Sequence, residues 1–285
     1  MKHLKIEGIL EKRFEKLNEA FEKARLHSQE NDIRLFSVKV KKLAACLQLL
    51  DNAKAHGHPI KLPQNMARIS ELFGNIRTLQ MQQIHIQDRI KEKNIGSPET
   101  YLRFIGDQIL EHMEDAAKHI KGEYPFKKEE DKLLALLPKQ LSREAMLHFV
   151  SSEGDALEKL FIPVFPADKS FHEARKHLKT LLYISPYLNL EIAELSPFKL
   201  FTSFEAINEF TRLLGKFQDM NTALECLYVS VPKMEIDENE KAILRGLEQT
   251  WVEAKEVFRV QIYNELQKIA ACGRTAAVPV EWPVM

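Results

Sequence analysis

The chain has few of the residues that interrupt helices or form disulfides. Its 285 residues include only 10 Gly, 12 Pro and 3 Cys, and no Cys-x-x-Cys pair occurs. The abundant Leu, Lys, Glu, Ala and Gln are good helix formers, so we expect an all-α fold. Cys46, Cys226 and Cys272 are odd in number, which is typical of free thiols in a reducing compartment.

Long apolar segments and enzyme signatures are also missing. No run reaches the 18 apolar residues of a membrane helix, and residues 1–14 lack the pattern of a signal peptide, so we expect a cytoplasmic protein with no membrane partner. The phosphate-binding loop, the Gly-rich dinucleotide motif, the zinc-protease motif and the serine elbow do not occur. We therefore expect neither an enzyme nor a bound cofactor.

An excess of charge of one sign is the third absence. Lys plus Arg equals Asp plus Glu, with 41 of each. A non-specific nucleic-acid binder carries a strongly basic surface, so the balance disfavours nucleic acid as a partner. Any anion site must instead come from local clustering of basic residues.

One helical segment carries potential metal ligands. His112, Asp115 and His119 follow each other at i, i+3 and i+7. A two-metal helical bundle needs Glu-x-x-His motifs from two helices, and the other histidines lack such a glutamate. We therefore expect no metal site.

Apolar residues recur every three or four positions over long stretches, which predicts amphipathic helices. The predicted helices cover about 6–28, 32–55, 64–92, 198–229 and a last segment that begins after Asp237 and ends at Gly273. Further helices are predicted to start at Ser97, Ser142 and Asp168, which are good capping residues. The polar segment 121–132 is the predicted linker. We therefore divide the chain into an N-terminal helical half, residues 1–125, and a C-terminal half, residues 126–285.

Two predicted helices carry a row of basic side chains on one face. At helical spacing, one face of the segment 171–183 gathers the following residues: His172, Arg175, Lys176, Lys179 and Tyr183. The segment 33–50 carries Arg34, Lys41 and Lys42 on the matching face. Rows of cations on rigid helices suit a polyanion such as phosphate. The structural alternative is a solvated face whose cations pair with neighbouring acids.

The two halves also align with each other. A shift of 138 residues places Arg34 on His172 and Lys41 on Lys179. A shift of 141 residues places LFGNIRTL, residues 72–79, on LLGKFQDM, residues 213–220. The alignment predicts an internal repeat: two helical bundles related by a pseudo-two-fold axis, with both basic rows near each other.

The second copy resembles the CHAD family, the conserved histidine α-helical domain. The likeness rests on the His-x-x-Arg pair at His172 and Arg175, followed by Lys179 and then by Leu214-Gly215, Gln218 and Asp219. It spans about residues 6–270. The resemblance implies an all-α fold of two related bundles and binding of inorganic polyphosphate on a basic surface, with no catalytic reaction.

The first copy departs from the family pattern. Arg34 stands where the family has histidine, Ser37 where it has arginine, and Thr78 where it has aspartate. Our first hypothesis remains a non-enzymatic binder of inorganic polyphosphate or a similar phosphorylated polyanion, with polyphosphate granule proteins as candidate partners. The second is a divergent helical scaffold that binds protein partners without polyphosphate. An enzyme that acts on phosphorylated compounds ranks last.

Overall fold

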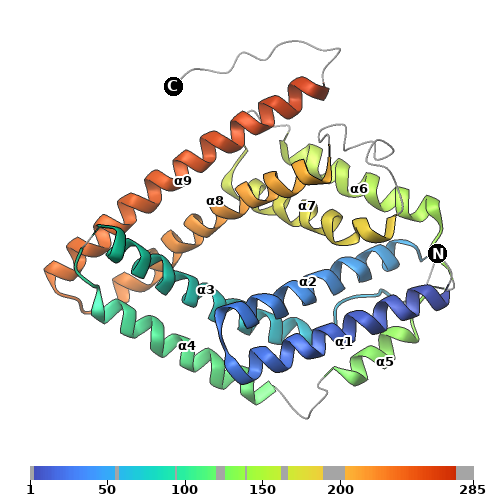
Figure 1. Cartoon of the computed structure of the whole chain (residues 1–285), viewed down its shortest axis with the longest axis horizontal. Helices are drawn as coiled ribbons and strands as arrows, with labels where there is room; N and C mark the ends of the chain where they lie inside the picture. Colours follow the sequence, from blue (N-terminus) through green and yellow to red (C-terminus); the bar gives the residue numbers. More distant parts are fainter. Residues whose placement is uncertain are drawn as a thin grey trace. The chain divides into compact units, whose positions relative to one another are not determined.

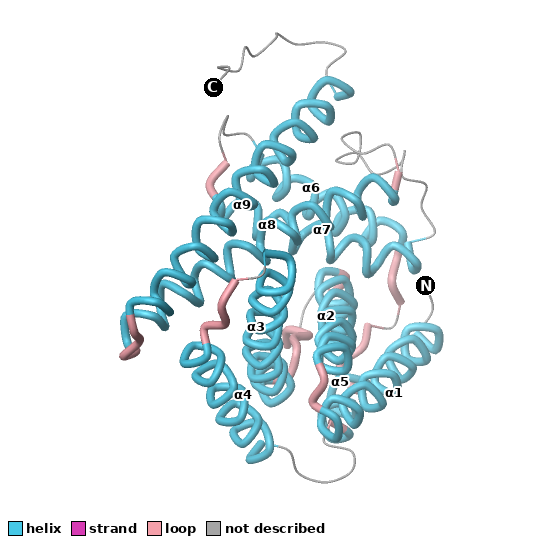
Figure 2. Tube along the Cα trace, turned by 60° about the vertical axis from the view of Figure 1, so that its left-hand side comes forward, coloured by secondary structure: helices cyan, strands magenta, loops and turns pink. Residues whose placement is uncertain are grey.

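The chain is built from helices joined by short connections. The computed structural model describes residues 3–54, 58–93, 95–119, 126–138, 140–161, 166–188 and 203–273. No strand occurs among these residues (Figure 2), which confirms the predicted all-α class. The helices are α1 His3–His27, α2 Glu30–Asn52, α3 Gln64–Lys93, α4 Glu99–His119, α5 Lys127–Leu134, α6 Arg143–Phe161, α7 Asp168–Leu188, α8 Phe204–Ser230, the 3₁₀ turn η3 Val231–Lys233 and α9 Glu238–Gly273.

Helices α1 to α4 each pack against the next helix along the chain (Figure 1). Helix α1 ends where Ser28 adopts a left-handed conformation with φ of 51°. This conformation lets the Ser28 amide donate to the Ala24 carbonyl at 3.0 Å and turns the chain directly into α2. The Gln80 side chain of α3 donates to the Ser28 carbonyl at 2.8 Å, so the turn is also tied to the third helix.

Residues 1–149 and 219–254 form one compact unit, and residues 150–218 and 255–285 form a second. Helices α8 and α9 each contribute residues to both units. The predicted halves, 1–125 and 126–285, were drawn from the repeat, and both the repeat and its boundary stay predictions. Below, we describe each compact unit by itself.

The first unit contains two hydrophobic clusters. Four phenylalanines from α1, α2, α3 and the start of α5 make ring contacts with centroid separations between 5.1 and 6.4 Å: Phe21, Phe36, Phe73 and Phe126. The second cluster joins α3 and α4 to parts of α8 and α9 around Trp251, which is 1% exposed. These contacts bury the apolar stripes that the helical periodicity predicts.

The structure corrects three of the predicted boundaries. Residues 127–134 of the predicted linker 121–132 and beyond form α5, whereas residues 121–125 lie outside the described part. Helix α8 begins at Phe204 rather than 198, because the Ser203 hydroxyl accepts from the Ala206 amide at 3.1 Å and caps it there. Asp168 does not cap α7: it is the first helical residue, and its carboxylate binds α9 instead.

Other predicted helix starts are confirmed, with one change of partner. The Ser142 hydroxyl accepts from the Ala145 amide at 3.1 Å and caps α6. Asp237 accepts from the Glu240 amide at 2.7 Å and so caps α9. The Glu240 carboxylate, however, accepts from the Tyr101 amide at 2.8 Å. This buried carboxylate therefore serves the first turn of α4, where the helix dipole favours a negative charge.

Two absences apply to the described residues alone. None of their helices is long and apolar enough to cross a membrane. None of their His, Cys, Asp and Glu side chains gather in a group of three that could hold a metal ion, and the side chain of His119 lies outside this description.

Candidate anion-binding site

Two short motifs of the second unit, one on α7 and one on α8, fit each other. The His172 imidazole donates from Nδ1 to the Gln218 side-chain oxygen at 3.0 Å. Three residues further along α7, the Arg175 guanidinium lies over Gly215, where a Cβ atom would be 3.5 Å from Nε. Because 172 pairs with 218 and 175 with 215, the two helix segments run antiparallel at this contact. We call these four residues the α7–α8 interlock.

The missing side chain at Gly215 creates the place for Arg175. Gly215 is buried in the middle of α8, and the edge-to-face contact of Phe171 with Phe217, at 5.2 Å between centroids, holds the two helices together beside it. The Nε atom of Arg175 is buried and makes no hydrogen bond within the described residues. The guanidinium is thus positioned by packing, and its hydrogen-bonding capacity is incompletely used.

The remaining residues of the predicted row on α7 have different environments. Lys176 is exposed and bonds Glu173 at 2.9 Å, a contact that lowers the pKa of the Glu173 carboxyl. Lys179 is half-buried. Burial raises the pKa of the Tyr183 hydroxyl, against the opposing charge of Arg175. Lys176 therefore matches the predicted alternative of a cation neutralised by an acid, whereas Arg175 makes no printed ion pair with an acid.

A second histidine of α7 lies outside this row. His177 bonds the Glu153 carboxylate of α6 at 2.9 Å. This hydrogen bond raises the pKa of His177, while burial opposes the shift. The pair ties α6 to α7 behind the basic face, and sequence reasoning did not find it because it depends on how the two helices pack.

The corresponding positions of α2 and α3 do not form an interlock. Arg34 is exposed and donates to Asn31 of its own helix at 3.3 Å, and Arg77 donates from Nε to Glu30 at 3.0 Å. Ser37, in the place of Arg175, is only 7% exposed, and a Cβ at Gly74 would meet no atom within 4 Å. The first copy therefore keeps the glycine without the arginine that would use it.

Basic residues do gather elsewhere in the first unit, between α1 and α2. Burial lowers the pKa of Lys42, and the positive charges of Lys39, Arg13 and Lys16 lower it further. We call these four residues the α1–α2 cation cluster. The neighbouring Lys41 is exposed. Among the predicted first-copy contacts, Lys42 thus acquires basic neighbours that sequence reasoning missed.

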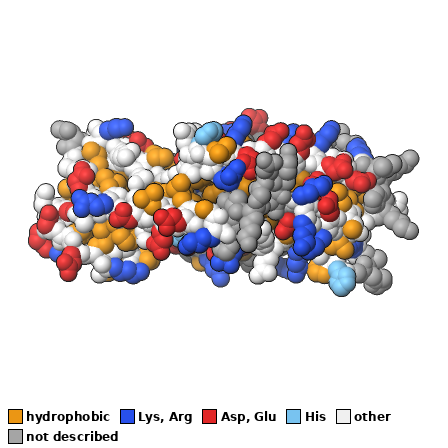
Figure 3. Space-filling model, turned by 90° about the horizontal axis from the view of Figure 1, so that it is seen from below, with side chains coloured by type: hydrophobic (Ala, Val, Ile, Leu, Met, Phe, Trp, Pro, Cys, Tyr) orange, Lys and Arg blue, Asp and Glu red, His pale blue; other side chains and the backbone are white. Residues whose placement is uncertain are grey.

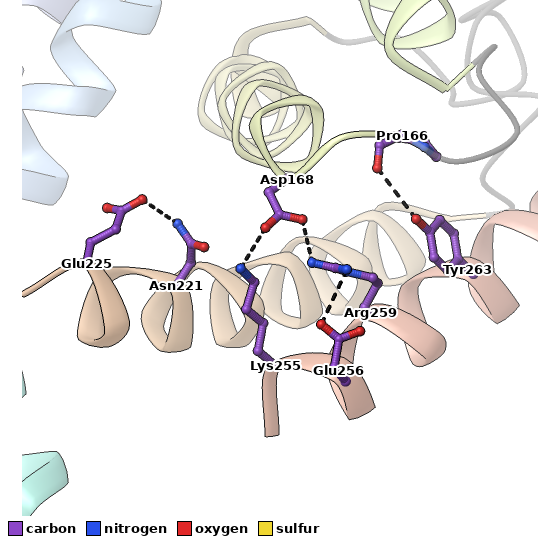
Figure 4. A network of polar contacts seen from close by, with 8 residues as sticks. All are labelled: Pro166, Asp168, Asn221, Glu225, Lys255, Glu256, Arg259 and Tyr263. Carbon is purple, nitrogen blue, oxygen red and sulfur yellow. Dashed lines mark hydrogen bonds and ion pairs between the residues drawn. The ribbon is translucent and has the colours of Figure 1, made fainter. Parts of the chain in front are cut away.

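The start of α7 holds two further cations that the sequence did not point to. Lys255 and Arg259 of α9 bind the two oxygens of the Asp168 carboxylate, at 2.6 and 2.7 Å (Figure 4). Both cations also lie over the Phe217 ring, 5.4 and 5.7 Å from its centroid. The second unit therefore carries cations from α7 and α9 around one short stretch of α8.

Basic and acidic side chains are interspersed over the face of the molecule shown in Figure 3. This distribution agrees with the equal numbers of acids and bases in the sequence. An anion would therefore be attracted by a local arrangement of cations rather than by the field of the whole surface. Because the α1–α2 cation cluster and the α7 face belong to different units, their predicted convergence stays a prediction.

Comparisons with known proteins agree with this architecture. The model of the CHAD domain family matches residues 8–228, which is more than half of the chain. The chain therefore belongs to the CHAD family. A search of the curated proteins finds no significant match. Among solved structures, the crystal structure of the CHAD domain from the plant Ricinus communis is similar, with a TM-score of 0.65 and 13% identity over 98% of this chain and 93% of that chain. At this identity the likeness concerns the fold.

Proposed function

We propose that this chain binds inorganic polyphosphate or a similar phosphorylated polyanion, without catalysing a reaction on it. The observation that carries the proposal is the α7–α8 interlock, which fixes an arginine and a histidine on one helix face. Family membership supports it, because some CHAD domains are known to bind substances of the polyphosphate type. A cytoplasmic location and contact with granule proteins belong to the same proposal.

The chemistry of the α7 face suits a chain of phosphates. Arg175 offers a planar fork for bidentate contact with an oxyanion, and Lys179 offers a point charge one turn further along the helix. His172 donates from Nδ1 to Gln218, so its second ring nitrogen is the one that can donate to an anion when the ring is protonated. From 172 to 183 the face extends over about 16 Å of helix, at 1.5 Å per residue. Several linked phosphates fit this length, so a chain gains over free phosphate by binding at several points.

The experiment is a titration of fluorescently labelled polyphosphate at two salt concentrations. Wild-type affinity should fall steeply with salt, since each phosphate contact adds about 0.7–0.9 to the slope of log K against log salt. The double variant Arg175→Ala/Lys179→Ala should abolish detectable binding at the higher salt and lower the slope by about 1.5.

A matched control removes the same formal charge from another helix. Arg143 and Lys159 are both exposed on α6, so Arg143→Ala/Lys159→Ala changes the net charge equally without touching the α7 face. This control should bind almost as wild type does, and circular dichroism should show all variants folded. Equal loss in both double variants would mean that net charge, and not the α7 face, determines binding. Wild-type binding retained by Arg175→Ala/Lys179→Ala would contradict the proposal.

One observation favours the alternative of a protein-binding scaffold. A groove of about 450 Å³ between the end of α8 and the start of α9 is lined largely by apolar side chains, among them Val231, Met234 and Leu244. Tyr228 and Val229 are 55% and 59% exposed at the end of α8. A patch of this kind suits a partner protein.

The two functions are distinguished by one additional pair of variants. If the chain binds no polyphosphate at low salt, a specific protein should co-purify with it and be lost from Tyr228→Ala/Val229→Ala. The control is Leu26→Ala, because Leu26 is 67% exposed on α1. Loss of the partner from this control as well would count against docking at the groove.

A further inference from the structure

An acidic side chain stands at the head of the basic row on α7. Asp168, His172 and Arg175 follow each other at i, i+4 and i+7, which places them on one helix face. The two carboxylate oxygens of Asp168 bind two different cations of α9: Oδ2 accepts from Lys255 at 2.6 Å and Oδ1 from Arg259 at 2.7 Å (Figure 4). One internal anion therefore occupies a pair of cations beside the proposed binding face.

The cation pair does not depend on Asp168 alone for its position. The Lys255 ammonium and the Arg259 guanidinium lie 5.4 and 5.7 Å from the centroid of the buried Phe217 ring. Glu256 contacts the second terminal nitrogen of Arg259 at 3.3 Å. Cation–π contacts of this kind retain their attraction when a neighbouring carboxylate is removed. The two cations should therefore remain in place without the charge of Asp168.

The Asp168 carboxylate presents two oxygens to two donors, as one edge of a phosphate group does. Arginine and lysine side by side are the usual partners of such an oxyanion. We propose that Lys255 and Arg259 form an additional phosphate subsite at the start of the α7 face, and that Asp168 is its built-in competitor. The inference rests on the proposed function, since it extends the same face by two cations that Asp168 keeps neutralised.

The competition has a measurable consequence. Asp168→Asn keeps the size of the side chain but removes its charge, so the cation pair becomes available to a phosphate of the bound chain. One additional charge-assisted contact should tighten polyphosphate binding roughly tenfold at low salt. In the wild-type background, Lys255→Ala/Arg259→Ala should change affinity little, because those two cations are already paired with Asp168.

The experiment compares four proteins by titration of labelled polyphosphate of defined length at low and moderate salt. They are the wild type, Asp168→Asn, Lys255→Ala/Arg259→Ala and the variant that combines all three changes. We expect tighter binding by Asp168→Asn and a return to near wild-type affinity in the triple variant. The control is Glu265→Gln, which removes another α9 carboxylate that pairs with a lysine, Lys268, at 2.7 Å; its affinity should stay close to wild type.

Each other outcome has a distinct meaning. A gain by Asp168→Asn that persists in the triple variant would be a general charge effect and would overturn the subsite. Unchanged or weaker binding by Asp168→Asn, with wild-type binding intact, would show that the carboxylate only anchors α9, and the inference alone would fail. If neither wild type nor Asp168→Asn binds polyphosphate, the proposed function fails and the inference fails with it. Should Asp168→Asn not fold, Asp168→Ser replaces it, since serine is well tolerated at the start of a helix.

Discussion

Gly215 provides a direct test of how the α7–α8 interlock positions Arg175. A Cβ atom at this position would lie 3.5 Å from Arg175 Nε and 3.8 Å from Nη2, which is ordinary van der Waals contact. Gly215→Ala should therefore fit without displacing the guanidinium. Alanine in a helix interior is favoured over glycine by about 0.5–1 kcal/mol, so the free energy of unfolding should rise by this amount. For a chain of this size the melting temperature should increase by about 2–4 °C.

Gly215→Leu should have a different effect, because the atoms beyond Cβ enter the space that the Arg175 guanidinium occupies. The displaced arginine can no longer hold a phosphate at the same place, and polyphosphate affinity should fall roughly tenfold, the loss of one charge-assisted contact. The control is Gly74→Leu in α3, where a Cβ would meet no atom within 4 Å. Thermal unfolding and labelled-polyphosphate titration measure the two effects separately. Unchanged affinity of Gly215→Leu would refute the role of this glycine, and destabilisation by Gly215→Ala would refute the packing.

Three further outcomes follow from buried contacts. Because the hydrogen bond of Glu153 raises the pKa of His177, the pair stabilises the fold below the unfolded pKa of about 6.5 and loses this effect as pH rises through the higher folded pKa; thermal unfolding from about pH 5 to 8 should show a smaller decline in Glu153→Gln. Glu240→Ala leaves the Tyr101 amide without its acceptor and should lower the free energy of unfolding by about 1–3 kcal/mol in urea titration, and an unchanged value would contradict the capping role. Trp251→Ala should cost about 3–5 kcal/mol in the same assay, since the ring is 1% exposed in the core; a loss under 1 kcal/mol would contradict this burial.

Most helices could be predicted because their apolar stripes are long and regular. The predicted segments 6–28 and 64–92 correspond to His3–His27 and Gln64–Lys93. Helix α5 was missed because it is short and mostly polar, and only its buried Glu130 and Leu133 contact the interior. A single turn and a half of helix carries too little periodicity to distinguish it from a linker.

Helix ends depend on partners that the local sequence does not reveal. Asp168 is a favourable capping residue by type, yet its carboxylate is taken by Lys255 and Arg259, which lie more than 80 positions further along the chain. Glu240 stands at the position of a capping box, and its carboxylate instead serves Tyr101. In both cases tertiary contact overrides a local preference, and such contacts require the register between helices to be known.

The basic face of α7 could be predicted from spacing within a single helix, whereas the partners of its residues could not. One part of the site was nevertheless accessible. Helices α1 and α2 are joined at Ser28 and Gln29, so positions equally far from this turn lie opposite each other. That rule brings Arg13 towards Lys42 and the α1–α2 cation cluster together, had the turn been used to set the register. No comparable rule links α9 to the start of α7, because α8 and long connections lie between them.

Fold and binding face rest on separate sets of residues in this chain. The phenylalanines of α1, α2 and α3 pack in the first unit without any help from Arg34, which is exposed and bonds only its own helix among the contacts described. Substituting Arg34 therefore leaves the core unchanged, and the family fold persists where the family's basic pattern has been lost. In α7, by contrast, Arg175 occupies space that the packing of Gly215 leaves open. A cation built into the helix contact in this way is a more specific sign of a binding face than a cation on the surface, and it is the reason to look for anion binding in the second copy first.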